Sequence, residues 1–127
     1  MSAYMAQDNR TVGEVIHDAR VKLKRSLRDV TGELDITPSY LSDIENDRRI
    51  PSEDVLRDLA KLLELEYDDL MARAGRLGDD AVRYMKNTPA AGVLFRRLAD
   101  VNASTETLGR LLKEVNKGNV KKKESSH

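Results

Sequence analysis

Residues 37–46 of this chain, TPSYLSDIEN, place short hydrogen-bonding side chains on one side of a helical pattern and apolar side chains on the other. Leu41 and Ile44 recur at helical spacing and therefore face one way. Serine hydroxyls can donate to or accept from most base edges, and a carboxylate can accept from the amino group of cytosine. The residues that face outward, and that could do this chemistry, are Thr37, Pro38, Ser39, Ser42 and Asp43.

The flanking sequence predicts two short helices that position these side chains. Ser26 is a good N-cap, residues 27–34 follow as about two helical turns, and Asp35 and Ile36 make a turn. Thr37 then caps a second helix, with Pro38 at a first position where a missing N–H costs nothing. This layout is a helix-turn-helix, whose second helix can enter the major groove of DNA, although an ordinary helical hairpin without a ligand has the same spacing. The expected inner face consists of Val30, Leu34, Ile36, Leu41 and Ile44.

Residues 12–75 resemble the lambda-repressor-like, Cro-type DNA-binding domains, also called the XRE family. The motifs that carry the resemblance are Ile16 and Arg20 in a leading helix, SLRDV at 26–30, TPSYLSDIEN at 37–46, RRIPSEDVLRDLAKLLEL at 48–65, and Asp69-Leu70. Thr31 stands where the family usually has Ala, and Asp35 where it usually has Gly. A threonine can return its hydroxyl to a carbonyl of the preceding turn, and Asp tolerates a left-handed conformation. The resemblance implies an all-α, five-helix DNA-binding domain.

The resemblance also implies roles for individual residues. Bases would be read from the helix that opens at Thr37, by Thr37, Pro38, Ser39, Ser42 and Asp43. No Arg or Gln stands on this face, so we expect DNA shape to carry part of the specificity. An ion pair between Arg20 and Glu45 would orient the motif. The expected contacts to the DNA backbone are Leu27, Arg28, Tyr40, Asn46, Arg48 and Arg49.

The types of some residues expected at the DNA backbone also allow a role that does not involve DNA. Exposed arginines on a small domain are often merely solvated, and the ring of Tyr40 could equally cover the helix pair. The amides of Leu27 and Arg28 are expected to face a phosphate because they open a helix.

The sequence predicts four segments: a flexible arm at 1–10, the DNA-binding domain at 11–75, a helical C-terminal oligomerisation region at 79–116, and a disordered basic tail at 117–127. Helix caps are expected at Thr11, Ser52, Asp79, Thr88 and Ser104. The helices of 79–116 are too short and too few to bury a core alone, so they would cover either the N-terminal domain or a second subunit. Because operators are two-fold symmetric, we expect a homodimer. The expected dimerisation residues are Leu94, Phe95, Leu98, Leu108, Leu111 and Leu112.

The charge distribution bears on how DNA would be bound. The 127 residues carry no net charge, but the charges are unevenly distributed. Residues 1–75 hold 11 basic and 16 acidic side chains, whereas residues 76–127 hold 11 basic and 6 acidic side chains. The expected DNA-binding half is thus the acidic half, which predicts weak, salt-dependent non-specific affinity and favours a dimer on a specific site. The chain has no Cys, no signal peptide and no apolar run of membrane-spanning length, so we expect a cytoplasmic protein without a membrane role.

These observations favour a sequence-specific transcriptional regulator, a repressor that binds double-stranded DNA as a homodimer on a palindromic operator. An antitoxin or protein-interaction module that binds a regulatory protein is the alternative, and the acidic N-terminal half favours it. We expect neither an enzyme nor a metal or cofactor. There are only two His, and no Gly-rich phosphate loop or metal-spaced cluster is present.

Overall fold

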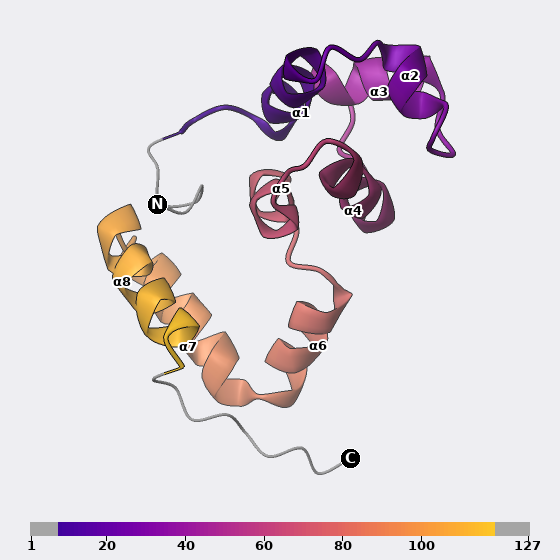
Figure 1. Ribbon diagram of the computed structural model, residues 1–127. Coiled ribbons are helices and arrows are strands. Elements are labelled where there is room, and N and C mark those ends of the chain that lie inside the picture. The colour runs from indigo at the N-terminus through magenta and orange to yellow at the C-terminus, as the bar shows by residue number, and fades with distance from the viewer. Residues whose placement is uncertain (1–7, 119–127) are drawn as a thin grey trace.

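The computed structural model describes residues 8–118, and in this part of the chain all regular structure is helical (Figure 1). The predicted all-α fold is therefore confirmed. No helix among these residues is long and apolar enough to cross a membrane. The helices are α1 (Val12–Lys22), α2 (Leu27–Thr31), α3 (Pro38–Glu45), α4 (Glu53–Leu62), α5 (Tyr67–Arg73), α6 (Asp79–Asn87), α7 (Pro89–Asp100) and α8 (Thr105–Asn116).

Side-chain caps set the starts of most of these helices. Thr11 and Ser26 each form a capping box with the acidic residue three positions later, which satisfies two otherwise unpaired amides at each end. The same hydroxyl-to-amide bond begins α3, α4 and α8, at Thr37, Ser52 and Ser104. One expected cap is wrong, and another lies in place without its side-chain bond. Gly78, and not Asp79, occupies the cap position of α6. Thr88 occupies the cap position of α7 as expected, but its side chain makes no capping bond.

Helix α2 is shorter than the eight residues predicted. It ends at Thr31, and residues 32–36 form the turn. Bonds from Glu33 N to Val30 O and from Leu34 N to Thr31 O tighten the chain to a 3₁₀-like spacing, which spreads the reversal over several residues. Asp35 consequently does not need the left-handed conformation, which the described non-glycine residues adopt at Lys24, Asp47, Glu64 and Asn102 instead.

The core lies among α1–α5 and consists of aliphatic side chains. Leu34 and Ile36, from the turn, pack against it while remaining half-buried. Complete burial of each aliphatic side chain contributes about 1.5–3 kcal/mol, so this cluster dominates the stability of the five-helix unit. The buried members are Val12, Val15, Ile16, Val30, Leu41, Ile44, Leu56, Leu59, Ala60, Leu63, Leu70, Met71 and Ala74.

Helices α6–α8 have no comparable core. They leave the five-helix unit after α5 as a separate arm (Figure 1). No residue of α6 or α7 is buried, and Gly109 is the buried residue of α8. Large apolar side chains on this arm remain exposed, at Val82, Tyr84, Val93, Leu94, Phe95, Val101, Leu108, Leu111, Leu112 and Val115.

The end of the N-terminal segment lies against the five-helix unit. The guanidinium of Arg73 donates to the carbonyls of Asp8 and Arg10, at 3.2 and 2.6 Å, and is itself held by Asp69 at 2.9 Å. Arg10 also pairs with Asp18 of α1 at 2.9 Å. Residues 8–10, predicted to belong to a flexible arm, thus join α5 to α1. The other residues of that arm, and all but the first two of the predicted basic tail, lie outside the described residues.

Helix α1 crosses the C-terminal end of α3 at Gly13. A Cβ atom on Gly13 would lie 2.4 Å from the carbonyl oxygen of Ile44 and 2.8 Å from that of Glu45, closer than such atoms approach. The Gly13 amide donates to the Asp47 carboxylate at 3.2 Å, and the Thr11 hydroxyl donates to it at 2.6 Å. Only a residue without a side chain allows this crossing.

We expect Gly13→Ala to destabilise the protein, because its methyl group meets rigid backbone and α1 must shift away from α3. Overpacking of this kind costs about 1–3 kcal/mol, which denaturant unfolding would measure. Gly92→Ala is the matched control. Its nearest contact would be Met85 Cγ at 3.7 Å, and alanine inside a helix gains about 0.5–1 kcal/mol over glycine. Wild-type stability in Gly13→Ala would contradict the prediction.

Candidate nucleic-acid interface

Helix α3 presents a polar face to solvent because its other face is fixed in the core. Leu41 and Ile44 are fully buried. With 3.6 residues per turn, Ser39 and Asp43 lie on the side opposite this buried pair. Ser39 is exposed, and Ser42 and Asp43 are half-buried. Thr37 and Pro38 are exposed at the beginning of the helix. All five candidate base-reading residues are therefore at least partly accessible.

A nearly buried carboxylate joins the end of α3 to α1. Glu45, whose side chain is 5% exposed, accepts two hydrogen bonds from Arg20, from Nε at 2.7 Å and from the second guanidinium nitrogen at 2.9 Å. The third guanidinium nitrogen donates to the carbonyl of Arg25 at 2.8 Å, in the loop that leads to α2. Arg20 thus fixes α1, the α1–α2 loop and α3 relative to one another. An ion pair between Arg20 and Glu45 was expected to orient the motif in this way.

His17 is a third member of this cluster, and sequence reasoning missed its contact. Its Nδ1 lies 2.8 Å from Glu45 Oε1, while half of its side chain stays exposed. Burial raises the pKa of Glu45, but the hydrogen bonds from Arg20 and His17 outweigh burial and hold the pKa below its ordinary value of 4.5. The spacing of His17 and Arg20, one turn apart on α1, was the available signal.

The loop after α3 turns back along the helix. Asp47 has φ of +59°, its amide donates to Ile44 O at 3.1 Å, and the Arg48 amide donates to Asp43 O at 2.8 Å. This pair of bonds is a Schellman motif, which normally has glycine at the left-handed position. Asp47 tolerates the conformation because its carboxylate is held by Thr11, the N-cap of α1, and by Gly13. The loop is therefore anchored on a second helix.

Three polar residues expected at the DNA backbone contact other residues of the motif. The guanidinium of Arg49 lies over the ring of Tyr40, 5.2 Å from its centroid. Tyr40 is half-buried and packs against the core, so it does cover the helix pair. The side-chain amide of Asn46 donates to Ser42 O at 2.8 Å and completes the last turn of α3.

The beginning of α2 leaves two amides available. Its capping box uses the amides of Ser26 and Asp29, so those of Leu27 and Arg28, the first two helical residues, have no partner within the helix. The Leu27 side chain packs against the core, whereas that of Arg28 is exposed. This end of α2 can accept an anion from solvent. Among residues 8–118, no group of three His, Asp or Glu side chains could hold a metal ion.

A family described as a helix-turn-helix domain matches residues 13–76, which include the whole surface described above. The chain belongs to this XRE-type helix-turn-helix family, a class of DNA-binding transcriptional regulators and not of enzymes.

Its relatives include the transcriptional regulator ClgR of Mycobacterium tuberculosis, in strains CDC 1551 / Oshkosh and ATCC 25618 / H37Rv. Each is 31% identical over 97 residues, which cover 76% of this chain and 84% of the relative. Any stretch of 97 residues in a chain of 127 includes residues 31–97, so the similarity extends from the motif into α7. No solved structure matches the chain.

We expect Arg20→Ala to lower the free energy of unfolding by roughly 3 kcal/mol, because it leaves the Glu45 carboxylate nearly buried without its main partner. Thermal or denaturant unfolding would measure the loss. Arg96→Ala is the matched control, since Arg96 forms an exposed pair with Asp100 at 3.5 Å and should change stability by less than about 0.5 kcal/mol. Equal unfolding midpoints for the two variants would show that the Arg20–Glu45 pair stabilises little.

The lowered pKa of Glu45 predicts acid sensitivity. The unfolded chain binds a proton at Glu45 at a higher pH than the folded chain, so the stabilisation is present above pH 4.5 and is lost as pH falls through the folded pKa. Glu45→Gln cannot titrate, and its free energy of unfolding should therefore fall less steeply below pH 4.5 than that of the wild type. Parallel pH profiles of the two proteins, measured by denaturant unfolding, would contradict this assignment.

Proposed function

We propose that the protein is a cytoplasmic, sequence-specific repressor that binds a palindromic operator as a homodimer, with α3 in the major groove. The observation that carries this proposal is the fixed orientation of α3, whose buried face is held by Leu41, Ile44 and the Arg20–Glu45 pair. The opposite face bears short polar side chains, which let a helix approach base edges closely. Occupation of the operator is sufficient for repression because it excludes other proteins from the same DNA.

In this arrangement Thr37, Pro38 and Ser39 of the first turn approach the bases first, and Ser42 and Asp43 follow along the groove. The Leu27 and Arg28 amides hold one phosphate strand, since the N-terminus of a helix favours an anion. Arg49, supported by the Tyr40 ring, lies at the other edge of the motif. Asn46 keeps the last turn of α3 intact between them.

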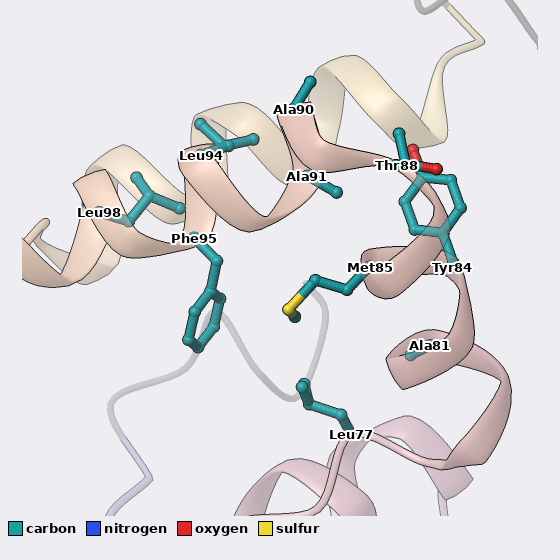
Figure 2. Close-up of a pocket in the computed structure, with 10 residues that line it drawn as sticks. All are labelled: Leu77, Ala81, Tyr84, Met85, Thr88, Ala90, Ala91, Leu94, Phe95 and Leu98. Carbon is teal, nitrogen blue, oxygen red and sulfur yellow. The ribbon is translucent and has the colours of Figure 1, made fainter.

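The exposed apolar surface of α6–α8 supports the homodimer. A groove of about 420 Å³ lies between α6 and α7, and Met85, Phe95 and Leu77 point into it (Figure 2). Exposed apolar patches of this kind mark interaction sites. A second copy that covers Leu94, Phe95, Leu98, Leu108, Leu111 and Leu112 would remove this surface from water and give the two-fold symmetry that a palindrome requires.

Selection of bound sequences from a random DNA pool tests the proposal. We expect a palindrome whose half-sites are separated by one helical turn, about 34 Å, or a multiple of it. Enrichment of a single asymmetric half-site would contradict the homodimer, and the absence of any enrichment at low salt would contradict sequence-specific binding.

Phe95→Glu should dissociate the dimer, because it places a charge in the apolar surface where Phe95 is 55% exposed. Sedimentation should show a monomer with wild-type helicity, and binding to the full palindrome should weaken to that of one half-site. Arg96→Glu, at the neighbouring and largely exposed position, is the matched control and should remain dimeric. A dimeric Phe95→Glu variant would place the interface elsewhere.

The same groove also favours a second role, the binding of a regulatory protein, since an apolar partner helix could cover it. Sedimentation of the wild-type protein discriminates between the two roles. A wild-type monomer at micromolar concentration would favour the regulatory partner over the homodimer.

A further inference from the structure

Two consecutive arginines follow α3, and their side chains reach different parts of it. The guanidinium of Arg48 lies 3.5 Å from the carboxylate of Asp43, whereas that of Arg49 lies over the ring of Tyr40. Asp43 is opposite the buried side of α3, and half-buried Tyr40 is at its flank. Arg48 therefore lies over the outward face of the helix, and Arg49 lies at the edge of that face.

The backbone accounts for this position of Arg48. The Schellman motif binds the Arg48 amide to the Asp43 carbonyl at 2.8 Å, which keeps the two residues adjacent. Asp47, between the helix and Arg48, is anchored by Thr11, the N-cap of α1, and by Gly13. The juxtaposition of Arg48 with Asp43 is therefore part of the packed five-helix unit and not of a free loop.

The chemistry of this pair suits a base contact better than a phosphate contact. The other outward side chains of α3 are short, and Arg48 supplies a long donor beside Asp43, the last of them along the helix. A guanidinium can donate two parallel hydrogen bonds to O6 and N7 of guanine, and a neighbouring carboxylate orients its planar fork. In water an exposed pair at this distance is weak, and 69% of the Arg48 side chain stays accessible, so donors remain for a base.

We propose that Arg48 reads a guanine in each half-site, that Asp43 is its positioning residue, and that Arg49 neutralises a phosphate. This inference rests on the proposed insertion of α3 into the major groove. It replaces the expected roles of Arg48 at the DNA backbone and of Asp43 as a direct acceptor from cytosine. Specificity then comes in part from Arg48, which follows α3 in the sequence and which the fold places against the outward face of that helix.

Selection from a random DNA pool and titrations at several salt concentrations, applied to Arg48→Ala and Arg49→Ala, test the inference. Arg48→Ala should lose the guanine preference at one position of each half-site, with affinity for the preferred sequence reduced about 5- to 150-fold. Its affinity for a site altered at that base should change little. Arg49→Ala should weaken all sequences alike and reduce the salt slope by about one unit.

Two further variants separate charge from geometry. Arg48→Lys keeps the positive charge but not the planar fork, so it should weaken the guanine preference while retaining the salt slope. Asp43→Asn should relax preference at the same base position as Arg48→Ala. Because Arg48 and Asp43 lie outside the core, circular dichroism and thermal unfolding should show wild-type folding in all four proteins.

The results that overturn the inference differ from those that overturn the proposed function. An unchanged selected sequence for Arg48→Ala, with uniform loss of affinity, would make Arg48 a phosphate contact although the protein remains a sequence-specific regulator. If Asp43→Asn relaxed the base preference at a different position from Arg48→Ala, Asp43 would not be the residue that positions Arg48. A wild-type protein that selects no sequence would overturn both proposals.

Discussion

The carboxylate of Glu45 is the point on which the five-helix unit depends. A charge that is nearly excluded from water requires partners, because its desolvation costs several kcal/mol if it is unpaired. Arg20 provides two hydrogen bonds and uses its remaining nitrogen on the carbonyl of Arg25, while His17 adds a contact from the same face of α1. The interaction therefore specifies one relative placement of α1, the α1–α2 loop and α3, which apolar packing alone would leave less well defined.

A second constraint acts close to the first. Gly13 allows α1 to contact the backbone of α3, and Asp47 ties the loop after α3 to the beginning of α1. Two contacts of different chemistry, one steric and one ionic, thus fix the same crossing. Their functional consequence is that both the outward face of α3 and the loop bearing Arg48 and Arg49 are held in one geometry. A preorganised surface of this kind loses little conformational entropy when it binds.

The two halves of the chain have opposite physical characters. Helices α1–α5 bury an aliphatic core and expose an acidic surface with a few well-placed arginines, whereas α6–α8 expose apolar side chains and bury almost nothing. The first half is complete as a folded unit. The second leaves large apolar side chains exposed, and the similarity to ClgR extends from the domain into α7 of this arm. In the proposed function, recognition and assembly therefore lie in separate parts of the molecule.

The sequence alone determined the features that depend on local chemistry. Helix caps at Thr11, Ser26, Thr37, Ser52 and Ser104 follow from hydroxyl groups close to the amides they accept from. The burial of Val30, Leu41 and Ile44 follows from helical periodicity. The pairing of Arg20 with Glu45 was accessible only through resemblance to a known family. The tertiary structure decided the early end of α2, the crossing at Gly13 and the placement of Arg48 on Asp43. Gly13 and its neighbours on α3 are some thirty positions apart, and the direction of Arg48 depends on Asp47 being held by α1, so no local pattern of residue types encodes either contact.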